Sequence, residues 1–133
     1  MFRGDGPVAF CVLWNLIESV TERMPGQLEH LGVVGNLRTP LGVSWLLRGL
    51  WQMPQIRKVV VWGSDLTGSG QALLQLWQEG LQEGHKVPGF GWQVDELIPA
   101  SAVDELRAGV ELVDCRKRSL AEAVTELNWR GEG

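Results

Sequence analysis

The chain has 133 residues, of which 44% are hydrophobic and 21% are charged, and its formal net charge is −4. This length predicts one domain over residues 1–133, with an ordered part from about residue 6 to residue 127. The acidic balance argues against nucleic acid as a partner, because nucleic-acid-binding proteins present clustered Lys and Arg. The one basic run, residues 116–118, is interpreted as a solvated turn. No apolar run reaches the roughly 18 residues that a membrane span requires, and no export signal is recognised, so we expect a cytoplasmic protein.

The first half of the chain alternates between strand-like and helix-like patterns. Residues 8–13 are nearly all apolar and predict a buried strand, and residues 14–24 predict a short helix or turn. A second strand is predicted over residues 31–34. Thr39 then provides an N-cap and Pro40 the first helical residue. The helix stops before Pro54 and is predicted to bury the stripe Val43, Leu46, Leu47, Leu50 and Trp51.

The second half continues the alternation as far as the tail after Trp129, which is expected to fray. Its predicted elements are a strand over 56–62, a helix from Ser69 or Gly70 to Gly80 or Gly84, a short strand within an extended loop over 85–98, a helix over 99–108, a strand over 110–113 and a helix capped by Ser119 that ends near Leu127.

Such alternation predicts an α/β fold, a three-layer sandwich of Rossmann-like or flavodoxin-like shape around a mostly parallel sheet of about five strands. The strand order is not fixed by the sequence. Right-handed crossovers nonetheless bring the loops that follow the strands to one edge of the sheet, where folds of this class bind ligands.

The segment GSDLTGSGQAL, residues 63–73, leaves the predicted strand over residues 56–62 at that edge. Backbone N–H groups and small residues are two of the features of a phosphate loop. The third is a lysine, and Ser69 stands in its place, so nucleoside triphosphate hydrolysis is not predicted. The alternative interpretation is a tight turn in which the Ser69 hydroxyl caps the next helix.

A second polar cluster, residues 35–39, leaves a different predicted strand towards the same edge, so the two loops are expected to face each other across a ligand pocket. Three side chains keep two interpretations each. Asn15 contributes to the pocket or caps its own turn, Asp65 accepts a ligand hydroxyl or binds the turn's N–H groups, and Arg38 pairs with a ligand anion or makes a surface salt bridge. The candidate cofactor-binding residues are Asn15, Asn36, Arg38, Gly63, Ser64, Asp65, Thr67, Gly68, Ser69, Gly70 and Gln71.

Seven tryptophans and no tyrosine are unusual for a chain of this length. Trp45, Trp51 and Trp77 lie on or near helical core stripes, and we expect them to pack in the core. Three others end strands or lie in a loop, where they either pack or line a flat-ringed ligand: Trp14, Trp62 and Trp92.

Residue types suited to metal binding or nucleophilic catalysis are sparse and scattered. Cys11 and Cys115 lie outside any Cys-x-x-Cys motif and are interpreted as buried, reduced thiols. His30 and His85 have no second ligand at metal spacing and are interpreted as solvated. No metal site and no catalytic residue are therefore predicted.

Five short motifs, in the same order along the chain, resemble the corrinoid-binding subunit of tetrahydromethanopterin S-methyltransferase and bacterial relatives labelled thymidylate-synthase-like. The likeness covers about residues 6 to 115. The matching segments are Gly6-Pro7-Val8-Ala9, Gly35-Asn36-Leu37-Arg38-Thr39, Pro54-Gln55-Ile56-Arg57 with Gly63-Ser64-Asp65, Gly70-Gln71-Ala72-Leu73, and Val110-Glu111-Leu112-Val113-Asp114.

This resemblance implies a Rossmann-like cytoplasmic domain that binds a corrinoid, that is, a cobalamin-type cofactor, for one-carbon metabolism with a partner enzyme. The family's turn carries a histidine proposed as the cobalt ligand, whereas the segment Gly68–Gln71 here is shorter and has none. The expectation is thus a soluble cofactor-binding module without histidine ligation, taking a base-on or unligated corrinoid, a pterin or a nucleotide. The alternatives are a thymidylate-synthase-like or other one-carbon or nucleotide enzyme, and a structural or assembly domain without a ligand.

Overall fold

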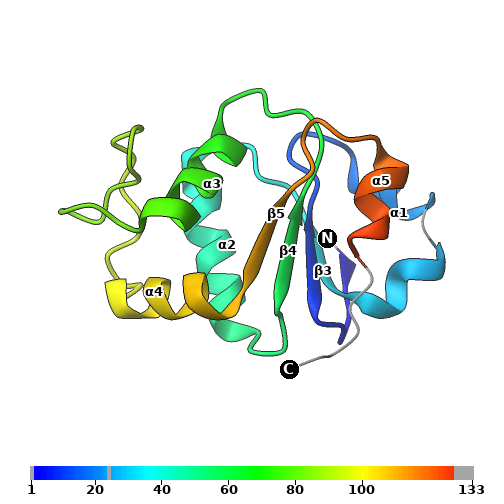
Figure 1. Cartoon of the computed structure of the whole chain (residues 1–133), viewed down its shortest axis with the longest axis horizontal. Helices are drawn as coiled ribbons and strands as arrows, with labels where there is room; N and C mark the ends of the chain where they lie inside the picture. The colour runs from blue at the N-terminus through cyan, green and yellow to red at the C-terminus, as the bar shows by residue number, and fades with distance from the viewer. Residues whose placement is uncertain (1, 24, 128–133) are drawn as a thin grey trace.

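The computed structural model of the chain describes residues 2–23 and 25–127, so the tail predicted to fray lies outside the described residues. Four strands form a parallel sheet in the order β3-β2-β4-β5, and β1 (Phe2–Arg3) joins it at the edge, antiparallel to β3 (Figure 1). The parallel strands are β2 (Val8–Cys11), β3 (Leu31–Gly35), β4 (Lys58–Val61) and β5 (Glu111–Asp114).

Strand order fixes where the chain reverses its direction of winding. Counted along the chain, the four parallel strands lie in the order 2-1-3-4, which is the start of the flavodoxin-like arrangement. After β2 the chain continues to β3 on one side, and after β3 it crosses back to β4 on the other side of β2. The loops that follow the neighbouring strands β2 and β4 therefore lead away in opposite directions. This switch point is where doubly wound folds bind their ligands.

Helices cover both faces of the sheet and make the three layers that the sequence predicts (Figure 1). On one face lie α2 (Pro40–Gln52), α3 (Ser69–Glu79) and α4 (Ala100–Gly109). On the other lie α1 (Ile17–Thr21) and α5 (Leu120–Thr125), while the 3-10 turn η1 (Pro25–His30) leads into β3. Alternate residues of β2 divide between two cores: Ala9 and Cys11 pack under α2 and α3, and Val8 and Phe10 pack under α1 and α5.

Two of the predicted helix starts are confirmed in atomic detail. The Thr39 hydroxyl accepts a hydrogen bond from the Gly42 N–H at 3.4 Å, with Pro40 beginning α2. Ser119 and Glu122 form a reciprocal capping box at α5, with bonds of 3.2 and 3.1 Å. The backbone N–H of Ser119, which bonds the charged Glu122 carboxylate, lowers the pKa of that side chain.

Other predicted elements differ from the structure. The strand predicted within residues 85–98 is wrong, because that segment is a loop held by two isolated bridges, Gln82 to Lys86 and Lys86 to Gln93. The short β1 went unpredicted, since two residues carry no periodic pattern. The helix predicted within residues 14–24 is confined to the five residues of α1.

The prediction that Trp45 and Trp51 pack in the core is wrong. They are 64% and 47% exposed, and the buried stripe of α2 is Val43, Leu47 and Leu50. At about 100° per residue, Trp45 lies roughly 160° around the helix from Leu47. Trp77 does pack against the core, as predicted, and its indole N–H donates to the Val110 carbonyl at 2.9 Å. Among the helices that the structure describes, none combines the length and the apolar character needed to cross a bilayer.

Candidate functional site

An open cleft of about 560 Å³ lies at the carboxyl ends of β2, β4 and β5, at the switch point of the sheet. Residues from the loops after all three strands, together with Gln71 of α3, form its wall. They are Asn15, Trp62, Gly63, Ser64, Asp65, Gln71, Arg116, Lys117 and Arg118.

The floor of the cleft depends on a close approach between the loops after β2 and β4. Gly63 has φ +110°, and a Cβ at this position would lie 2.8 Å from the Val12 carbonyl oxygen, so only glycine fits. The Asn15 side-chain oxygen accepts the Ser64 N–H at 2.9 Å. Asn36 donates from its amide to the Asn15 carbonyl at 2.6 Å. Asn15 therefore bridges two loops and does not cap its own turn, which corrects that alternative.

The loops after β3 and β4 also meet, as expected, but they bond directly to each other. No residue of 35–39 lines the cleft, so the expectation that the two loops face each other across it is wrong. The Thr67 hydroxyl donates to the Arg38 carbonyl at 2.8 Å, because a carbonyl only accepts. The Ser69 hydroxyl, fully buried and 2.9 Å from the Thr67 oxygen, then donates to it. The Thr67 hydroxyl therefore joins the two loops, the Ser69 hydroxyl supports it from within the same turn, and neither residue lines the cleft.

Asp65 occupies the place where a phosphate loop would hold an anion. Its carboxylate accepts the N–H groups of Gly70 and Gln71, each at 2.9 Å, and so neutralises the amino end of α3. The alternative in which Asp65 binds the turn's own N–H groups is confirmed. The interpretation of Ser69 as the cap is wrong, since Gly68 is the N-cap residue and no side chain caps from that position.

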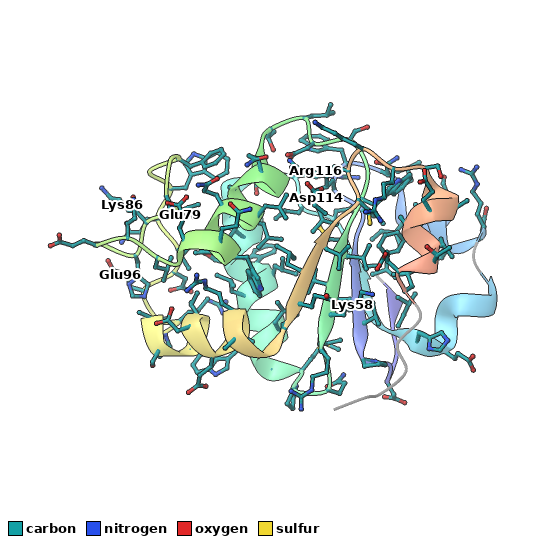
Figure 2. All side chains as sticks on the ribbon, in the orientation of Figure 1. Lys58, Glu79, Lys86, Glu96, Asp114 and Arg116 are labelled. Atoms are coloured by element: carbon teal, nitrogen blue, oxygen red, sulfur yellow. The ribbon has the colours of Figure 1, made fainter. Side chains whose placement is uncertain are left out.

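Arg116 is locked in place by acceptors from three segments. Its guanidinium donates to both oxygens of Asp114 at 2.9 and 3.0 Å, to Asp65 at 3.2 Å and to the Gln71 side chain at 2.9 Å. Figure 2 shows Asp114 and Arg116 together at the end of β5. The hydrogen bonds from Arg116 lower the pKa of Asp114, and those bonds raise the pKa of Arg116. Arg116 thus links the end of β5 to the start of α3 through charged hydrogen bonds.

Lys117 and Arg118 complete the basic wall of the cleft. Both are exposed, which agrees with a solvated turn, yet both line the cleft together with Arg116. The Arg118 carbonyl accepts the indole N–H of Trp62 at 3.0 Å, and this bond holds the indole at the cleft wall. Sequence reasoning missed these cations as site residues, although they follow β5 directly and the edge rule applied to β3 and β4 also covers β5.

Arg38 takes a third arrangement that neither of its two interpretations included. Its guanidinium carbon lies 5.5 Å from the centre of the Trp14 indole, a cation–π contact. Arg38 does not line the cleft. Of the predicted residues, Asn15, Gly63, Ser64, Asp65 and Gln71 line it, whereas Asn36, Arg38, Thr67, Gly68, Ser69 and Gly70 do not.

Neither histidine is placed to bind a cobalt ion at this cleft. His85 lies in the loop after α3, half-buried and 2.8 Å from the Ile98 carbonyl, so its interpretation as a solvated side chain is wrong. His30 ends η1, at the opposite edge of the sheet. Among the described residues, no group of three His, Cys, Asp or Glu side chains is arranged for a metal ion. The site therefore does not fit a corrinoid that takes its lower ligand from a protein histidine.

Comparison of the sequence with protein-family models and with curated proteins finds no match.

Proposed function

We propose that this protein is a cytoplasmic cofactor-binding module that holds an anionic, flat-ringed cofactor in the switch-point cleft and serves one-carbon metabolism with a partner enzyme. The observation that carries the proposal is the composition of the cleft wall. Three consecutive cations and one indole meet the polar side chains of Asn15, Ser64 and Gln71 across one opening.

Such a cofactor needs one contact for its negative charge and another for its flat ring, and the cleft offers them at different residues. Arg116 is already engaged by two carboxylates, and Arg118 pairs with Glu126 at 3.5 Å. Lys117, which forms no ion pair among the described residues, therefore supplies the charge for a carboxylate or phosphate of the ligand. Trp62 offers a flat surface for a ring, and its ring centre lies 6.3 Å from that of Phe10, which supports it from the core. The remaining polar residues, Asn15, Ser64 and Gln71, contact the polar atoms at the edge of the ring and so give specificity.

Folates, other pterins with a carboxylate or phosphate tail, and nucleotides combine a flat ring with negative charge and match this wall best. A corrinoid remains compatible only in a form that does not require a protein histidine, which is the base-on or unligated form. The resemblance to the methyltransferase subunit supports the one-carbon context of the proposal.

Thiol-based enzyme chemistry is less well supported than binding. Burial raises the pKa of the Cys11 thiol to about 12, and burial also raises the pKa of Cys115. Both thiols are free and buried, as the sequence predicts. Because the thiolate is the nucleophile, neither cysteine is prepared for the attack that a thymidylate-synthase-like enzyme would need.

The test is thermal unfolding of the chain with cobalamin, folate or a nucleoside monophosphate. A ligand at 100 times its Kd adds about 2.7 kcal/mol of stability, which raises the melting temperature measurably. We expect Lys117→Glu to abolish this rise. Lys86→Glu is the matched control, because Lys86 is an exposed lysine in the distant loop after α3 (Figure 2). The proposal fails if no compound stabilises the protein or if the two variants lose binding equally.

A further inference from the structure

A second cavity lies on a different part of the molecule, between α2 and the strands β2 and β3. Its volume is about 170 Å³. Val33 of β3, Cys11 of β2 and Met53 after α2 are among its walls, and no charged side chain of the described residues lines it. The cavity is separate from the switch-point cleft, and the two share no lining residue.

Two glycines leave this space open without serving the fold. Gly49 lies in the interior of α2 and Gly35 ends β3, and a Cβ at either position would find no atom within 4 Å. Neither has a positive φ. Glycine weakens a helix interior relative to alanine, so Gly49 carries a cost that no internal contact explains. Close approach of a bound molecule to the backbone does explain it.

Trp45 stands at the mouth of the cavity. It lines the cavity while its side chain is 64% exposed, away from the stripe of α2 that packs on the sheet. An exposed indole at this place gives the opening a flat apolar wall. Core packing does not require the Trp45 indole to be exposed. Its exposure is explained if the indole covers a ring bound in the cavity.

We propose that this cavity is a binding site for a small, uncharged, apolar molecule of about one ring. The size follows from the volume, since an apolar cavity of about 150 Å³ takes up benzene. The lack of charge in the occupant follows from the lining, which offers no ion to compensate a buried charge. This site goes beyond the cofactor cleft and does not depend on it.

The experiment uses indole as the probe and methyl NMR spectra of the full chain as the readout. We expect saturable shifts of the Val33, Leu46, Leu50 and Met53 methyl groups with indole, and none with benzoate, which is similar in size but charged. Gly49→Leu places a side chain in the cavity and should abolish the indole shifts. Gly109→Leu is the matched control, because a Cβ at this helical glycine also finds open space, outside the cavity.

Three results would overturn the proposal. They are an absence of methyl shifts in the unsubstituted chain at millimolar indole, shifts that persist in Gly49→Leu with a folded spectrum, and equal shifts with benzoate. Methyl shifts that follow protein concentration without indole would instead show that a second copy of the chain covers α2, and this too would overturn it. Loss of cofactor binding in Lys117→Glu leaves the indole shifts unchanged, so the two proposals fail independently.

Discussion

The cleft and the α2 cavity are built on opposite principles. In the cleft, three side chains bond to other segments and hold the loops in place: Asn15 to the chain at Ser64, Asp65 to the start of α3, and Arg116 to both aspartates that face it. In the cavity, regular elements leave space because Gly35 and Gly49 have no side chain. The first is a polar framework held at fixed positions, and the second is a gap between packed surfaces.

This difference teaches where substitution is tolerated. At Gly63 the framework of the cleft has no room, so an added Cβ meets the Val12 carbonyl and the Asn15 side chain. The cavity has room, so an added Cβ at Gly35 or Gly49 meets no neighbouring atom. The same kind of change should therefore have opposite effects in the two places.

The largest expected effect concerns Cys11, which lines the cavity. A pKa raised from 9.0 to about 12 reduces the thiolate fraction near neutral pH about a thousandfold, at tenfold per pKa unit. In a Cys115→Ala variant, we expect native protein to be almost unreactive with a thiol reagent at pH 8 and to react at the ordinary rate in urea. Fast labelling of the native variant would show that the cavity holds a solvated thiol.

Alanine at Gly63 and at Gly49 should change stability in opposite directions. Gly63→Ala places a Cβ against the Val12 carbonyl in a left-handed conformation and should cost about 2–4 kcal/mol of unfolding free energy. Gly49→Ala improves helix propensity and meets open space, so it should add about 1 kcal/mol. Urea unfolding of the two variants measures both values. Equal signs would contradict the contrast between the two regions.

Asp65→Ala should cost about 2 kcal/mol, since it removes the carboxylate that caps α3 and one of the partners of Arg116. Asp65→Asn keeps an acceptor for one N–H and should lose less. Chemical denaturation ranks the two variants against the unsubstituted chain. If both were as stable as that chain, the carboxylate would not be the cap.

Asp114→Asn should have the smallest effect, seen only in its dependence on pH. The pKa of Asp114 is lowered in the folded state, so its contribution is present above the unfolded value of 3.8 and is lost as the pH falls through the folded value. The side chain is 43% exposed, which screens the pair. We expect the acid branch of the stability curve to become slightly shallower in the variant. An unchanged curve below pH 4 would argue against the ion pair with Arg116.

The sequence was sufficient where a single local pattern decides the structure. Thr39 with Pro40, and Ser119 with Glu122, mark helix starts that depend only on neighbouring residues. The alternation of strand and helix patterns was enough to predict the three layers. The sequence was insufficient where two side chains could each cap the same helix. Ser69 and Asp65 are both capable of bonding the start of α3, and the fold of the preceding turn brings Asp65 to Gly70 and Gln71.

The site was partly predictable for the same reason. The edge rule placed the loops after β3 and β4 together, because it follows from topology alone. It did not reveal which side chains turn towards the cleft: Asn36 and Thr67 bond to backbone carbonyls of neighbouring loops, and Arg38 lies over Trp14. Such orientations depend on contacts between segments more than 20 residues apart, which no local pattern records.

The central claim is that the switch-point cleft binds the cofactor, and amide NMR spectra test it most directly. The compound from the cobalamin, folate and nucleotide set that stabilises the chain most would be titrated into labelled protein. The account predicts shifts that converge on Asn15, Ser64, Gln71 and Lys117 and that disappear in Lys117→Glu but not in Lys86→Glu. Shifts confined to other surfaces, or no shifts with any compound of the set, would contradict it.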